Sequence, residues 1–333
     1  MRKGVLLLNL GTPDQCDQRS VSRYLREFLL DPRVIDLPFY IRWPLVNFFI
    51  IPFRCQKTTA AYQKVWDIES PLLKHSNNLV TDLSQILPDY EIALGMRYGQ
   101  PNIQSALQQL KYCEQVAIIP LFPQYSSAAT GSALEKTLQA ISQQWNIPSI
   151  KIKTDFYNDA EFISAYAEII KTHLIDKKID LLLFSYHGLP ERHIDKSECV
   201  STCDRTHACP AMDARNRFCY RAQCYATSRS LAEALQLQPQ QYQVAFQSRL
   251  GRTPWIKPYT DLQLPQFISQ GIKNIAIVCP SFVADCLETL EEINIRAREQ
   301  WMSLGGESFT FIPCLNNHPA WVKGLGEMIA DLG

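Results

Sequence analysis

Short apolar runs alternate along this chain with longer segments whose apolar residues recur every three or four positions. Residues 5–10 and 181–184 are runs of leucine and other apolar residues that end at turn-forming residues, and they are short enough for buried strands. Residues 20–30 show the spacing of an amphipathic helix. This alternation, repeated over most of the sequence, predicts an α/β protein with parallel sheets.

The alternation occurs once in the first half of the chain and again in the second. We therefore expect two similar, doubly wound (Rossmann-like) parallel-sheet domains that face each other across a cleft, with the site in the cleft. The first domain is predicted to span residues 1–164 and the second 165–314. Residues 315–333 are expected to pack back on the first domain.

Composition narrows the class of protein. Hydrophobic residues make up 46% of the chain, and 33 basic side chains balance 33 acidic ones, which describes a globular protein without a net field that attracts nucleic acid. We expect no nucleic-acid partner. The apolar start is too short for a signal peptide and leads into Gly-Thr-Pro-Asp, so we expect a cytoplasmic protein.

Residues 37–54 form the most hydrophobic segment. Three prolines and Arg42 interrupt it, so it is not expected to be a regular membrane-spanning helix. One interpretation is a buried irregular segment. The other, which we favour, is an apolar lip that binds a hydrophobic ligand or touches a bilayer surface.

The strand predicted at 181–184 ends in Ser-Tyr-His-Gly, and this places His187 at a position where α/β proteins bind ligands. His187 is therefore a candidate catalytic residue or metal ligand, although a histidine at a strand end can also serve only to orient the backbone.

A second candidate follows the strand predicted at 274–280. On a helix, Asp285, Glu288 and Glu292 would stand at i, i+3 and i+7 and place three carboxylates along one face. Such a row can accept protons or pass a hard cation, and a histidine facing it would complete a nitrogen and oxygen site suited to iron. The alternative is a solvated helix with ordinary acidic residues in its first turn.

Five of the eleven cysteines lie between residues 199 and 224, alongside two histidines. Their spacing matches no zinc-finger pattern, but their density favours a thiolate-bound metal over a plain loop. The five are Cys199, Cys203, Cys209, Cys219 and Cys224.

Five short motifs, at residues 8–13, 123–126, 185–190, 246–249 and 285–290, occur in the order and at the separations found in ferrochelatases, and the chain resembles that family over nearly its whole length. The resemblance implies a lyase that inserts ferrous iron, its substrate, into protoporphyrin IX, releases two protons and forms protohaem. Alternatives are a chelatase for coproporphyrin or another metal, a non-catalytic haem or porphyrin carrier, and an iron–sulfur electron-transfer protein.

Matching the motifs residue by residue carries the family's site onto this chain. The resemblance makes His187 and Glu288 the catalytic and metal-binding pair, with Glu292 as a further acid, and it leaves open which of the pair takes the pyrrole protons. It implies a porphyrin-binding wall made of Arg97, Tyr98, Tyr125 and Trp255. Arg296 stands where the family pattern has one more acid.

The resemblance also bears on two other segments. It implies that residues 37–54 are the lip of the porphyrin cleft, which favours peripheral membrane contact. It further implies that four of the five clustered cysteines hold a [2Fe–2S] cluster, with zinc or no metal as the alternatives.

Overall fold

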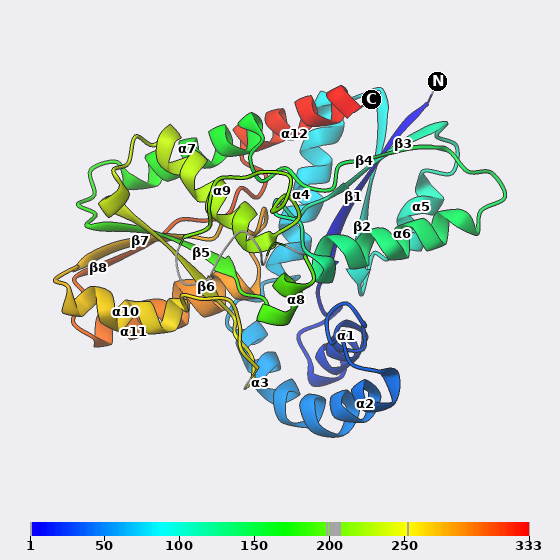
Figure 1. The fold of residues 1–333 in the computed structure, drawn as a ribbon. Coiled ribbons are helices and arrows are strands. Elements are labelled where there is room, and N and C mark those ends of the chain that lie inside the picture. Colours follow the sequence, from blue (N-terminus) through cyan, green and yellow to red (C-terminus); the bar gives the residue numbers. More distant parts are fainter. Residues whose placement is uncertain (1, 198, 200–207, 252, 333) are drawn as a thin grey trace. The chain divides into compact units, whose positions relative to one another are not determined.

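The computed structural model describes residues 2–197, 199, 208–251 and 253–332, and its chain divides into two compact units (Figure 1). Unit 1 comprises Met1–Phe122, Ser127–Thr154 and Leu325–Gly333, and unit 2 comprises Pro123–Ser126 and Asp155–Gly324. The domain boundaries predicted after residues 164 and 314 both lie within unit 2.

Unit 1 contains one sheet of four parallel strands in the order β2-β1-β3-β4. Its strands are β1 (Lys3–Gly11), β2 (Tyr90–Tyr98), β3 (Gln115–Pro120) and β4 (Ser149–Ile152). Its helices are α1 (Gln18–Leu29), α2 (Phe39–Pro44), the π-helix η1 (Leu45–Ile50), α3 (Ile51–Gln63), α4 (Pro71–Ile86), α5 (Ile103–Gln109), the π-helix η2 (Ser127–Gly131) and α6 (Ser132–Ser142).

The central strand β1 explains why this sheet has helices on both faces. Leu6 and Leu8 pack against α5 and α6, while Val5 and Leu7, whose side chains point to the opposite face, are also fully buried. A strand buried on both faces reads as a continuous apolar run rather than as an alternation, and this is the pattern of residues 5–8.

Unit 2 contains a second parallel sheet, in the order β6-β5-β7-β8. Its strands are β5 (Leu181–His187), β6 (Tyr242–Gln247), β7 (Asn274–Val278) and β8 (Ser308–Phe311). Its helices are α7 (Ala160–Leu174), α8 (Glu191–Asp195), α9 (Tyr220–Ala234), the short η4 (Pro239–Gln241), α10 (Thr260–Ser269), the π-helix η5 (Glu288–Ala297) and α11 (Arg298–Ser303); α12 (Pro319–Leu332) begins in unit 2 and ends in unit 1.

Both sheets have the same topology, with the first strand between the second and the third. The predicted class, two doubly wound α/β sheets, is confirmed. In such sheets the connections after the first and third strands leave in opposite directions, and the crevice between the carboxyl ends of these strands binds ligands. In unit 2 these strands are β5, which ends at His187, and β7, which precedes η5.

Residues 39–54 of the apolar segment are helical, in α2, η1 and the start of α3, and the alternative of a buried irregular segment is wrong. Pro38 immediately precedes α2, where a missing N–H leaves no helical bond unmade, and Pro44 ends α2 where the helix changes to η1. Pro52 lies in the first turn of α3, which continues directly from η1. The largest side chains of the segment project into solvent: Phe39, Tyr40, Ile41, Trp43, Phe48, Phe49 and Phe53.

Within the part of the chain that the structure describes, no helix has both the length and the apolar character needed to cross a membrane.

Candidate active site

His187 is the last residue of β5, and its surroundings hold both its backbone and its ring. Its N–H donates to Ser281 Oγ at 3.0 Å, and its carbonyl accepts from the Tyr220 hydroxyl at 2.8 Å. Nδ1 lies 2.7 Å from the Gly188 carbonyl oxygen, which can only accept. Nδ1 therefore carries the proton in the neutral ring, and Nε2 keeps a lone pair that can accept a proton or bind a metal.

The side chain of Gln247, at the end of β6, joins this strand to the helix that carries the acids. Its Oε1 accepts from Ser185 Oγ on β5 at 2.7 Å, and its Nε2 donates to the Glu288 carbonyl oxygen at 2.9 Å. The Gln247 carbonyl also accepts from Gly188 N at 2.8 Å. Because Gln247 is buried, these bonds are shielded from water and fix the first turn of η5 beside β5.

The carboxylate helix differs from the predicted one at its start. Glu288 and Glu292 lie on η5, but Asp285 precedes the helix, so the expectation of three carboxylates on one helical face is corrected. The buried Asp285 carboxylate accepts from Asn316 Nδ2 at 2.8 Å and from Thr289 Oγ1 at 2.9 Å, and it stabilises the turn into the helix. η5 is π-helical, a rare form of helix that is often found at functional sites.

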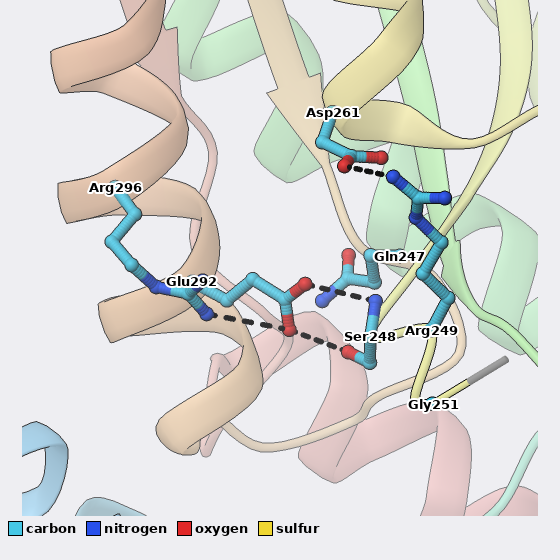
Figure 2. A pocket seen from close by; sticks show the side chains of 7 residues that line it. All are labelled: Gln247, Ser248, Arg249, Gly251, Asp261, Glu292 and Arg296. Atoms are coloured by element: carbon cyan, nitrogen blue, oxygen red, sulfur yellow. Dashed lines mark hydrogen bonds and ion pairs between the residues drawn. The ribbon is translucent and has the colours of Figure 1, made fainter. Parts of the chain in front are cut away.

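Glu292 lies in a polar pocket of about 480 Å³, shown in Figure 2. The pocket is lined by Gln247, Ser248, Arg249, Gly251, Asp261, Glu292 and Arg296. Ser248 donates to the Glu292 carboxylate twice, from its backbone N–H at 2.8 Å and from its hydroxyl at 2.5 Å. Arg296 reaches the same carboxylate at 3.9 Å and makes its closer ion pair, at 2.7 Å, with Glu291.

Two features distinguish this pocket. Ser248 has a φ of 67°, a left-handed conformation that is unfavourable for a residue with a side chain and is concentrated at functional sites. Loss of water raises the pKa of Glu292, and the hydrogen bonds from Ser248 and the charges of Arg296 and His187 lower it without cancelling that rise.

Trp255 and Tyr125 also lie in unit 2. The Trp255 ring centroid is 6.4 Å from that of His187, and its Nε1 donates to the Leu250 carbonyl, so its orientation is fixed. Tyr125 N donates to Gln223 Oε1 of α9 at 2.6 Å, and its ring meets Phe218 edge-on. The structure therefore brings Trp255 to the histidine, while Tyr125 is held on α9.

The other two predicted wall residues, Arg97 and Tyr98, end β2 in unit 1. Tyr98 is fully buried, and its hydroxyl donates to Asp31 Oδ2 at 2.9 Å. Arg97 donates to the same Asp31 oxygen and to Ser132 Oγ. Sequence reasoning missed Asp31 and Ser132, and it also missed the role of Ser248. The residues around each of them indicate only a turn or a helix start and do not point to a functional role.

Four of the five clustered cysteines fall in the described part of the chain and are buried, while Cys203 lies outside it. Burial raises the pKa of Cys219 to about 12, and the neighbouring Cys199 and Cys209 add to the rise. Arg221 donates to Cys209 Sγ at 3.0 Å. Among the described residues, no three His, Cys, Asp or Glu side chains are arranged to hold a metal ion, so these four thiols alone do not make a metal site.

Comparison with solved structures defines the class of fold. SirB from Bacillus subtilis with Fe³⁺ aligns over 100% of this chain and 96% of its own, with a TM-score of 0.56 and 10% identity. CbiX, described as the terminal enzyme for biosynthesis of siroheme in denitrifying bacteria, aligns over 98% of each chain with a TM-score of 0.50 and 11% identity. The protein thus has the two-sheet α/β fold found in chelatases.

Sequence comparison is more specific. The family model described as Ferrochelatase matches residues 2–332. A ferrochelatase of Legionella pneumophila (strain Corby) is 59% identical over 99% of both chains, and one of Coxiella burnetii (strain CbuK_Q154) is 48% identical over 98% of this chain and 92% of its own. The chain belongs to the ferrochelatase family.

Replacing Ser248 by alanine tests the electrostatics of the pocket. The change removes a hydroxyl donor that stabilises the ionised Glu292, so we expect the pKa of Glu292 to rise further. Titration of carboxyl ¹³C shifts, assigned with Glu292→Gln, measures this directly. Ser269→Ala, on the exposed end of α10, is the matched control. A Glu292 titration that does not move in Ser248→Ala would contradict this account of the pocket.

Proposed function

We infer that this protein is a ferrochelatase, a lyase of haem biosynthesis that inserts ferrous iron into protoporphyrin IX and releases two protons. The observation that carries the inference is family membership over residues 2–332, shared with relatives 59% and 48% identical. The chemistry of the site is consistent with it, because His187, Glu288 and Glu292 supply a neutral base and two carboxylates.

The contacts of His187 support a role in deprotonation. The reaction must remove a proton from each of two pyrrole N–H groups while the iron exchanges water for porphyrin nitrogens. We propose that Nε2 of His187 accepts a pyrrole proton, since its lone pair is oriented by the bond from Nδ1 to Gly188. Glu292 then stabilises the resulting imidazolium and is the next acceptor, because burial raises its pKa. Glu288 is then left to bind the incoming iron.

Two alternative functions, a porphyrin carrier and an iron–sulfur electron-transfer protein, explain fewer of these observations. A porphyrin carrier does not require a basic nitrogen that is oriented next to an acid of raised pKa. An iron–sulfur electron-transfer protein would not explain why the ferrochelatase family model matches residues 2–332.

Iron insertion by paired variants tests the proposal. We expect the parent protein to metallate protoporphyrin anaerobically. His187→Ala should reduce the rate by at least about 100-fold, the usual contribution of an acid–base group, and Glu288→Gln should reduce it because the incoming iron loses a carboxylate ligand. The Soret absorbance follows the product. His173→Ala on α7 and Glu299→Gln on α11 are matched controls outside the site. An inactive parent refutes the enzyme, while a fully active folded Glu288→Gln refutes only that assignment.

We further propose that the exposed apolar side chains of α2, η1 and α3 contact a membrane surface. What supports this is their density on one short segment: Phe48 and Phe49 are each 62% exposed and Phe53 is 76% exposed, although water is a poor environment for such rings. A hydrophobic substrate and product give such a surface a purpose.

Vesicle co-sedimentation tests this surface. Changing Phe48 and Phe49 together to serine should weaken binding to phosphatidylcholine–phosphatidylglycerol vesicles by at least about tenfold, because each buried phenyl side chain contributes about 1.5–3 kcal/mol. Trp145→Ser, which removes an exposed ring elsewhere in unit 1, should leave binding unchanged. Equal binding by the double variant and the parent rules out the proposal.

For the cysteine segment we propose a [2Fe–2S] cluster held by four of the five cysteines. The support is chemical: thiolates suit iron–sulfur clusters and zinc, and Cys199, Cys209, Cys219 and Cys224 are buried. The described thiols do not by themselves form a ligand set, and a set that includes Cys203 would still need three of them, so the proposal requires a rearrangement of the segment.

Metal analysis decides between the cluster, zinc and no metal. Anaerobically purified protein should contain about two iron and two sulfide per chain, with visible charge-transfer absorption, and Cys219→Ser should lose both. Cys55→Ser, in the other unit, is the control. Stoichiometric zinc, or neither metal, contradicts the cluster.

A further inference from the structure

The backbone of His187 lies beyond the point where one neighbouring strand ends. Parallel pairing between β5 and β7 stops at Phe184, whereas pairing with β6, on the other side, continues to His187 and Gln247. The N–H and C=O of one strand residue point to the same edge of the strand. In His187 both point away from β6, since it is the next N–H, that of Gly188, that donates to the Gln247 carbonyl. They therefore need partners that β7 does not supply.

Two side chains from other elements of unit 2 supply these partners. Ser281, which follows β7, accepts from the His187 N–H at 3.0 Å through its Oγ. Tyr220, the first residue of α9, donates its hydroxyl to the His187 carbonyl oxygen at 2.8 Å. Tyr220 is buried, so water competes little for this bond. The two side chains thus continue the hydrogen bonding of β5 where β7 has ended.

The bond from Tyr220 fixes the peptide group that joins His187 to Gly188. The carbonyl of this group accepts from Tyr220, and its N–H donates to the Gln247 carbonyl at 2.8 Å, so the group is held at both ends. A Cβ atom at residue 188 would lie 2.8 Å from the same Gln247 oxygen, so this close approach requires glycine. Glycine also allows the peptide group to rotate if one of its two bonds is lost.

The position of the Gly188 carbonyl sets the tautomer of the His187 ring. Nδ1 of the ring donates to this carbonyl at 2.7 Å, which keeps the proton on Nδ1 and the lone pair on Nε2. The peptide group between the two residues lies inside the ring of atoms that this bond closes, so a rotation of that group would move the acceptor away from Nδ1. Holding the peptide group therefore holds the side chain.

We propose that Tyr220 and Ser281 are positioning residues for His187: they hold the two peptide groups that flank it and so keep Nε2 of its ring ready to accept a pyrrole proton. The proposal rests on the proposed function, which makes His187 the base of the reaction. Both residues act through the backbone of His187 and take no proton from the porphyrin themselves.

Tyr220→Phe, which keeps the aromatic ring and removes the hydroxyl, is the first test. We expect kcat for iron insertion into protoporphyrin to fall about tenfold, a part of what an acid–base group contributes, with the KM values for protoporphyrin and Fe²⁺ within about twofold of the parent. Tyr186→Phe is the matched control. Its hydroxyl is also buried and bonds to α9, but to the side chain of Ser228 at 2.8 Å rather than to the backbone of His187, so its loss should leave kcat unchanged.

The tautomer of His187 is a readout that a loss of stability alone would not move. In protein labelled with ¹⁵N-histidine, two-bond ¹H–¹⁵N correlations report which ring nitrogen carries the proton, and His187→Ala assigns the signals. With the ring neutral, the parent and Tyr186→Phe should show the proton on Nδ1, whereas Tyr220→Phe should show a mixture of the two tautomers. Ser281→Ala should change the signals in the same way, and it tests the proposal if Tyr220→Phe does not fold.

A double-mutant cycle shows whether Tyr220 acts through the histidine. In a His187→Ala background, Tyr220→Phe should cause no further loss of kcat, because no ring remains to be positioned. Two results overturn the proposal: a folded Tyr220→Phe, or Ser281→Ala in its place, that keeps the parent's kcat or tautomer, and a loss of kcat that persists in full with His187→Ala. A parent that inserts no iron refutes the proposed function, and the tautomer in the same variants then tests the positioning of the ring by itself.

Discussion

The amide of Gln247 is the interaction on which the geometry of the candidate active site most depends. Strand β5 delivers His187 and the connection after β7 delivers Glu288, but neither element sets the distance between them alone. Gln247 bonds Ser185 on β5 and the carbonyl of Glu288 at the start of η5. Because an amide offers a donor and an acceptor on opposite sides, one buried side chain can bridge both elements without leaving a polar atom unpaired.

Two carboxylates that lose water have opposite protonation behaviour in this protein. Asp31 accepts four hydrogen bonds and pairs with Arg97, and these outweigh burial, so its pKa is lowered. Glu292 accepts two hydrogen bonds, both from Ser248, among the residues that the structure describes, and Arg296 lies 3.9 Å away, so burial prevails and its pKa is raised. The number of donors thus makes Asp31 a permanent anion and Glu292 a group that can take up a proton.

Arg296 lies between two carboxylates near the end of η5, those of Glu291 and Glu292. Its ion pair with Glu291 directs most of its charge away from Glu292, which leaves Glu292 under weaker positive influence than a close pair would give. The left-handed Ser248 compensates by donating twice to the same carboxylate, and the backbone strain at Ser248 is offset by these charge-assisted bonds. The pocket in Figure 2 is therefore set by loop geometry as much as by the helix.

The sequence alone determined the features that depend on residues close together along the chain. Apolar runs of strand length and turn residues placed β5 and put His187 at its end, and the repeated alternation predicted two sheets of one class. Tertiary structure decided the rest. It placed Asp285 before the helix rather than on it, made residues 39–54 helical with exposed rings, and brought Asp31 to Arg97 and Ser132, which are 66 and 101 positions away. Periodicity records which face of an element is apolar, whereas the partner of a buried polar group depends on contacts between distant segments, which exist only once the sheets have formed.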